Sequence, residues 1–138
     1  MNNSQPNLDR LAAEYAQKII NRIVDEKKVD DKEKKKLTAN ADNTITKSLG
    51  VLQENGVYAC FLYLLAKEKE NGSVVVEEML SLLEGLGFGW GKPTNNSAEA
   101  VLKHITETVT VDLERLLLAK ESLEQMLIYA RYGAKARD

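Results

Sequence analysis

The stretch that decides the fold is residues 57–66, which read VYACFLYLLA and are apolar at every position. Periodicity alone does not separate a buried strand from a buried helix in such a run. Residues 67–70 are good helix formers, and they favour a helix that continues past the apolar run. An apolar surface all round predicts a central, buried helix. Asn71-Gly72 is expected to end it.

The residues upstream of this run predict two amphipathic helices. The first is expected over about 7–28, where apolar residues recur at spacings of three and four, and it should fade in the charged stretch 25–33. The second is expected over about 33–53. Asn55-Gly56 should stop it, because both residues tolerate the left-handed conformation of a helix C-cap.

The residues downstream predict three more helices. Ser73 is expected to cap a fourth helix, Ser97 to start a fifth after a glycine-rich loop over 85–96, and Thr110 to cap a long last helix with Asp112 in its first turn. The predicted core face of that last helix consists of Leu113, Leu116, Leu117, Leu123, Leu127 and Ile128.

The length and composition of the chain limit its fold class and its number of domains. The chain has 138 residues, of which 43% are apolar and 29% charged, and this mix is typical of one globular domain. We therefore expect a single helical domain over 1–138, an all-α compact bundle of about six helices with a central apolar helix. No run approaches the ~18 apolar residues of a membrane span, and the polar N-terminus lacks a signal sequence, so a cytoplasmic protein is expected.

The residue counts argue against an enzyme. Cys60 is the only cysteine and His104 the only histidine, which excludes an internal disulfide and a multi-cysteine zinc site. Cys60 is predicted to be a small buried hydrophobe, and His104 a surface or hydrogen-bonded residue. The acidic residues at 25, 26, 30 and 31 lack the spacing of a calcium loop. We expect no catalytic residue, no metal and no cofactor.

The glycine-rich loop does not match a phosphate-binding motif. Gly91-Lys92 is followed by Pro93 where a Walker A loop needs a hydroxyl residue, and Leu86 stands where its first glycine belongs. The loop is predicted to be a flexible connection with Phe88 and Trp90 tucked onto the bundle. The alternative is that these rings are exposed for docking or base stacking.

The charge is nearly balanced, with 19 basic and 21 acidic residues and a net charge of -2. Any nucleic-acid binding therefore needs a local patch. Six lysines crowd residues 27–36, but acidic neighbours dilute them and favour a solvated linker. Other basic residues lie on the polar faces or at the ends of the predicted helices, and a phosphate-binding patch forms if those ends converge. Our candidate RNA-binding residues are Lys18, Arg22, Lys47, Lys67, Arg131 and Lys135.

Three segments, taken in order, resemble one family. The first is Glu14-Tyr15-Ala16 followed by Ile19, Ile20 and Ile23; the second is Asn55-Gly56-Val57 leading into 61–67; the third is 120–123 leading to Ile128, Arg131 and Tyr132. They are similar to the E-Y-A, N-G-L with A-F-L-L-A-K, and W-x-x-R-F-A patterns of the small all-helical subunit of the type III-B CRISPR effector, the Cmr complex. Order, spacing and length fit, so the resemblance covers most of the chain.

The chain departs from the family pattern at three core positions. Ile128 stands where the family often has Trp, Gly133 where it often has Ala, and Tyr63 replaces the Phe of the middle motif. Among the motif positions, Lys67 and Arg131 have the chemistry to contact phosphate.

The resemblance implies a role in RNA-guided defence. Small subunits of this family stack as a non-catalytic inner filament that lines the channel of the guide–target RNA duplex, and base pairing supplies the sequence recognition. The implied partners are other Cmr subunits, further copies of the chain, the CRISPR guide RNA and the target RNA, with no membrane and no small-molecule substrate.

Two other functions are compatible with a helical chain. One is an adaptor or regulator that binds only protein. The other is a helix-turn-helix DNA-binding protein with its turn at Asn55-Gly56, although the helix after that turn is too apolar to lie in a groove.

Overall fold

The computed structural model describes residues 6–137 and contains helices but no strand in that range. The elements are α1 (Leu8–Ile20), the π-helical turn η1 (Asn21–Asp25), α2 (Asp31–Asn55), α3 (Val57–Lys67), α4 (Glu70–Gly85), α5 (Ala98–Glu107) and α6 (Leu113–Lys135). The expected all-α bundle of about six helices is confirmed. Within the same range, no helix combines the length and the apolar character needed to cross a bilayer.

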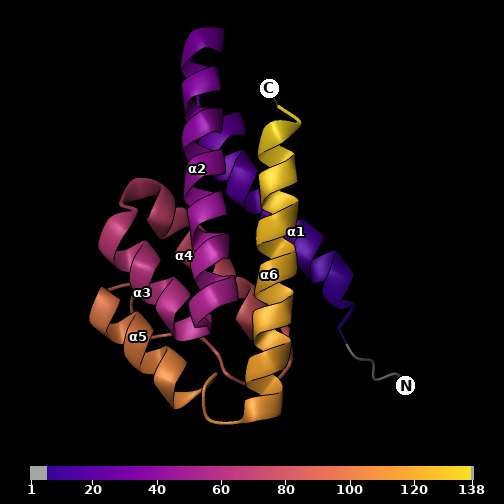
Figure 1. Ribbon diagram of the computed structural model, residues 1–138, viewed down its shortest axis with the longest axis vertical. Coiled ribbons are helices and arrows are strands. Elements are labelled where there is room, and N and C mark those ends of the chain that lie inside the picture. The colour runs from indigo at the N-terminus through magenta and orange to yellow at the C-terminus, as the bar shows by residue number, and fades with distance from the viewer. Residues whose placement is uncertain (1–5, 138) are drawn as a thin grey trace.

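Two long helices form the backbone of the bundle. Figure 1 shows α2 and α6 standing side by side, with α1 crossing behind α6 and with α3, α4 and α5 gathered on the other side of α2. The main packing partners of α6 are α1 and α2, and α1 also packs on α4. The buried apolar side chains form one cluster, to which all six helices contribute; its largest fully buried members include Ile19, Ile45, Phe61, Met79, Ile105 and Leu123.

The apolar run forms α3, but only one face of that helix is buried. Val57, Cys60, Phe61 and Leu64 lie in the core, whereas Tyr58 and Leu62 on the opposite face are exposed. The expectation of a helix buried all round is therefore wrong. The reason is its position, because α3 lies at the side of the bundle and the face turned away from its neighbours remains at the surface.

The boundary between α3 and α4 also differs from the expectation. Asn71-Gly72 does not end a helix, and Ser73 is not a cap: α3 ends at Lys67 and α4 begins at Glu70. A Cβ atom at Gly72 would lie 2.7 Å from the carbonyl oxygen of Leu64 and 2.8 Å from the Cβ of Glu68. The glycine therefore serves a close approach of the two helices rather than a chain reversal.

Side-chain caps mark several helix starts. Asp30 accepts a hydrogen bond from the backbone N–H of Glu33 at 2.8 Å, and Ser97 accepts one from Ala100 at 3.2 Å, as expected for the fifth helix. The cap of α6 is Asp112, which accepts from Arg115 at 3.1 Å, and not Thr110. The hydroxyl of Thr110 donates instead to the carbonyl of Thr106.

The lysine-rich segment is part of a helix. Because Asp30 caps α2, residues 32–36 lie in its first turns, and the linker expected over 27–36 shortens to the residues between η1 and α2. The first helical segment ends at Asp25, three residues before the expected end. At the other end, α2 stops at Asn55 as predicted, but Gly56 has φ +100° and ψ −176°, which is not the expected left-handed helical conformation.

The start of α6 extends past the core. Leu123 and Leu127 are buried as predicted, and Leu116 and Ile128 pack against the core while partly buried. The prediction is wrong for Leu113 and Leu117, which are 67% and 56% exposed. The expected tucking of the two loop aromatics is confirmed. The rings of Phe88 and Trp90 pack against the core cluster with their centroids 5.0 Å apart.

Candidate nucleic-acid interface

Two cations near the end of α6 face α2. The Nζ of Lys135 lies 3.5 Å from one carboxylate oxygen of Asp42, and the Nε of Arg131 lies 4.0 Å from the other. All three side chains keep substantial exposure to solvent. The Nε of Arg131 is buried and has no hydrogen-bond partner in the described part of the chain. This side chain is therefore near a counter-charge but is not satisfied by it.

The next cation, Arg137, is held more firmly. The Nε and Nη2 of its guanidinium donate hydrogen bonds to the carboxylate of Asp25 in η1 at 2.8–3.2 Å. Its Nη1 donates to the backbone carbonyl of Gly133 at 2.9 Å. The hydrogen bonds from Arg137 hold the pKa of Asp25 below its ordinary value in spite of partial burial, and the charge of Lys34 acts in the same direction.

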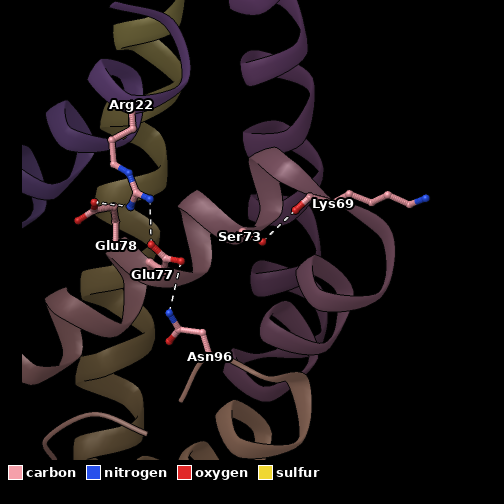
Figure 2. Close-up of polar contacts among 6 residues, drawn as sticks. All are labelled: Arg22, Lys69, Ser73, Glu77, Glu78 and Asn96. Atoms are coloured by element: carbon pink, nitrogen blue, oxygen red, sulfur yellow. Dashed lines mark hydrogen bonds and ion pairs between the residues drawn. The ribbon is translucent and has the colours of Figure 1, made fainter. Parts of the chain in front are cut away.

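Arg22 is not part of this group of cations. Figure 2 shows its guanidinium between Glu77 and Glu78 of α4, with both contacts at 2.9 Å. Burial opposes the charged form, but the hydrogen bonds to these two carboxylates outweigh burial and raise the pKa of Arg22. Asn96 also donates to Glu77, at 3.4 Å.

Figure 2 also shows the first turn of α4. There the hydroxyl of Ser73 donates to the backbone carbonyl of Lys69 at 3.1 Å. This contact lies within the start of the helix and adds no charge to the neighbourhood of Arg22. The polar contacts on this side of the bundle therefore fix α4 against η1 and the loop before α5.

The other three predicted residues lie on separate elements. Lys18 pairs with Glu14 of the same helix at 3.8 Å and lies over the ring of Tyr15. Lys47 is exposed on α2, and Lys67 is exposed at the end of α3. Of the six predicted residues, the structure thus brings Arg131 and Lys135 together, on a surface between α6 and the helix that carries Lys47.

The carboxylates that hold these cations were not predicted from the sequence. Asp42 follows the core residue Ala41 and reads as one more polar residue on an amphipathic helix. Its role depends on α6, whose cations are about ninety positions away in the chain. No local spacing indicates such a contact, and the same holds for the partners of Arg22.

Cys60 and His104, each the only residue of its type in the sequence, lie in different surroundings. Cys60 is fully buried, as predicted, and burial raises its pKa to about 12, so the thiolate is not available at neutral pH. Burial also lowers the pKa of His104. Among residues 6–137, no three His, Cys, Asp or Glu side chains are grouped so that they could hold a metal ion.

The fold and this surface define a class, an all-α bundle with a group of exposed cations between two long helices. Neither a scan against models of protein families nor a search of curated proteins finds a match to this chain. The resemblance to small helical subunits of Cmr complexes therefore stays a prediction from the three sequence segments.

Proposed function

We propose that the chain is a non-catalytic small subunit of a type III-B CRISPR (Cmr) effector complex. In this role, copies of the chain stack as an inner filament in the cytoplasm and help to hold the duplex of guide RNA and target RNA during antiviral defence. The partners are other Cmr subunits, further copies of the chain and the two RNAs. The role needs no cofactor, no small-molecule substrate and no membrane.

The observation that carries the proposal is the meeting of the three family-like segments in one core. The first segment lies in α1 and η1, the second forms the turn into α3, and the third lies in α6. Ile19, Phe61 and Leu123, one from each segment, belong to the same buried cluster. Motifs that are far apart in the chain but share one core are what a common fold requires, and this supports the family likeness.

The surface between α2 and α6 supports the RNA-binding part of the proposal. Arg131 and Lys135 are long, exposed cations on successive turns of α6. In an RNA-guided complex, base pairing reads the sequence, so a structural subunit needs only shape and charge. Contacts to phosphate position a duplex and carry no base information.

A second candidate function is a helical adaptor that binds only protein. The observation that favours it is the apolar surface at the start of α6, where Val111, Leu113 and Leu117 are exposed. Exposed apolar patches often mark contacts with other proteins. A subunit of a large complex also needs such contacts, so the two functions differ in RNA binding rather than in this patch.

Purification of the tagged chain from its own host separates the two functions. If the chain is a Cmr subunit, guide RNA and the filament-forming subunits co-purify with it. Recovery of one protein partner without RNA would favour the adaptor and overturn the proposal.

A second experiment tests the surface between α2 and α6. The effector complex is reconstituted with Arg131→Ala and Lys135→Ala together, and target-RNA binding is measured over a salt series. We expect weaker binding for every guide sequence, with the logarithmic salt slope reduced by about one unit for each lost phosphate contact. The matched control is Arg10→Ala with Lys103→Ala, which removes two exposed cations from other surfaces. An unchanged slope in a fully assembled complex would remove Arg131 and Lys135 from the RNA interface.

A further inference from the structure

A polar cleft lies where the first helical segment ends, α2 begins and α6 ends. Figure 1 shows the C-terminal end of α6 beside the first half of α2. The cleft has a volume of about 350 Å³ and is lined by Val24, Asp25, Asp31, Lys34, Lys35, Thr38 and Arg137. We call it the Arg137 cleft. None of its three cations is among the six residues chosen from the sequence.

The Arg137 cleft brings together charges that the sequence had spread over two distant segments. Lys34 and Lys35 come from the segment that read as a solvated linker, and Arg137 comes from the far end of the chain. Asp25 and Asp31 oppose them, which leaves an excess of one positive charge among the described residues that line the cleft. The hydroxyl of Thr38 donates to the carbonyl of Lys34, so Thr38 forms part of the wall without a free donor.

Arg137 is positioned in the cleft by its neighbours. Within residues 6–137, its contacts with Asp25 and Gly133 use three of the five N–H donors of a guanidinium and leave the other two without a partner. The carboxylate of Asp25 is itself an anion between two cations, because both Arg137, which follows α6, and Lys34 of α2 stabilise its charged form. The cleft therefore already stabilises one anionic oxygen. Because its guanidinium is held in place, binding a second anionic group costs little further side-chain entropy.

We propose that the Arg137 cleft binds a phosphate group of an RNA backbone, with Lys34, Lys35 and the free donors of Arg137 as its cations. Asp25 acts as a positioning residue that fixes the guanidinium and limits the affinity of the site. The proposal rests on the proposed function, because that function supplies the RNA. It extends the cationic surface of Arg131 and Lys135 along α6 to the start of α2.

The chain offers a matched pair of variants for the test. Lys34→Ala with Lys35→Ala removes two charges from the cleft, whereas Lys32→Ala with Lys36→Ala removes two charges from the same turns of α2 outside the cleft lining. Alanine is a strong helix former, so both variants should keep α2, which circular dichroism checks. Binding of a fluorescein-labelled oligouridine to the reconstituted complex is measured by anisotropy over a salt series.

We expect the cleft variant to bind about three- to tenfold more weakly at low salt and to lower the salt slope by about one unit. The control variant should keep the slope of the wild type. Equal losses in both variants would show a general charge effect and overturn the cleft as a site, and so would an unchanged slope in the cleft variant.

Asp25→Asn gives an independent readout, with Glu26→Gln as its control at the neighbouring exposed acid. Asparagine keeps an oxygen that accepts from Arg137 and removes the opposing charge, so Asp25→Asn should tighten RNA binding by about two- to fivefold, and the control should not. Binding that is unchanged or weaker in Asp25→Asn would contradict the limiting role of this carboxylate.

The outcomes separate the inference from the proposed function. If the wild-type complex binds RNA and the cleft variant binds equally well, the inference fails and the proposed function stands. If the wild-type complex neither carries nor binds RNA, the proposed function fails, and so does the claim that the cleft binds a phosphate of RNA. Inorganic phosphate titrated into the ¹⁵N-labelled full chain then tests the free anion: saturable shifts at Lys34, Lys35 and Arg137 without RNA competition would assign the cleft to free phosphate.

Discussion

The cations of this bundle occur in two different surroundings, which the two sides of the molecule illustrate. On α4, Glu77 and Glu78 hold Arg22 at 2.9 Å each, and the side chain of Glu78 is only 10% exposed. Between α2 and α6, Asp42 lies 3.5–4.0 Å from Lys135 and Arg131, and its side chain is 30% exposed. The ion pairs of Arg22 are therefore short and partly shielded from solvent, whereas those of Asp42 are longer and more exposed.

The difference teaches which charges hold the fold and which remain available. A carboxylate that has lost most of its water depends on its partner, so the Arg22 contacts belong to the architecture. Ion pairs between exposed side chains contribute little to stability, because solvent screens them and ordering the side chains costs entropy. The cations of α6 can therefore exchange one anion for another without unfolding the bundle.

The largest expected effect comes from breaking the ion pairs of Arg22. Arg22→Ala leaves Glu78 without its partner and should lower the free energy of unfolding by about 2–3 kcal/mol, below the ~3–5 kcal/mol of a fully buried pair because Arg22 is about one-third exposed. Arg131→Ala should cost about 1 kcal/mol or less. Urea denaturation followed by circular dichroism compares the two.

Glu78→Gln in the Arg22→Ala background is the control for this prediction. It removes the unpaired charge and should restore part of the lost stability. If Arg22→Ala and Arg131→Ala lowered the free energy of unfolding equally, the proposed difference between the two kinds of ion pair would be wrong.

Two helical glycines give the same contrast without charge. At Gly72 of α4, a methyl group would press against the backbone of α3, so Gly72→Ala should destabilise the protein by about 1–2 kcal/mol even after the gain in helix propensity. At Gly50 of α2, a Cβ meets nothing within 4 Å, and Gly50→Ala should stabilise by about 0.5–1 kcal/mol. Thermal melts of both variants measure the difference, and a stabilising Gly72→Ala would contradict the close approach.

The smallest expected effect concerns pH. Because the pKa of Asp25 is lowered in the folded chain, its contribution to stability is present above about pH 4 and is lost as the pH falls through the folded value. Asp25→Asn should therefore melt lower than the wild type at neutral pH, and the gap should narrow in acid. Melting temperatures from neutral to acidic pH measure the gap, with Glu26→Gln as control. If the difference in melting temperature between the wild type and Asp25→Asn stayed constant with pH, the stabilisation would come from packing of the side chain rather than from its charge.

Much of the fold followed from the sequence because helices of this chain bury regular apolar stripes. The recurrence of Leu8, Tyr15 and Ile19 indicates a helix without reference to its neighbours, and Ser97 and Gly56 mark local ends. Gly72 was misread because its role depends on how near α3 lies, and single-chain propensities carry no such information. The prediction that Leu117 lies in the core is wrong for a related reason. The apolar face of α6 continues beyond the helices that cover its later turns, so Leu117 remains exposed.

The candidate site was less predictable because charge acts between elements. Arg22 and Arg131 look alike in the sequence. Arg22 donates hydrogen bonds to carboxylates 55 and 56 positions away, whereas Arg131 only lies 4.0 Å from Asp42. Lys34 and Lys35 were set aside because acidic neighbours dilute them along the chain. Those neighbours include Asp30, whose side chain is used to cap α2.

The π-helical turn η1 carries a consequence for how the length of this chain can vary. Its hydrogen bond from the N–H of Glu26 to the carbonyl of Asn21, at 2.8 Å, spans one residue more than an α-helical turn would enclose. The turn is thus equivalent to a one-residue insertion kept within a helix. Deletion of one residue from 21–25 would therefore convert the π-helical turn into a regular α-helical turn, and the side chains on either side of it would keep their directions. We therefore expect related chains that lack this residue to keep the acidic partner of Arg137 at the end of their first helical segment.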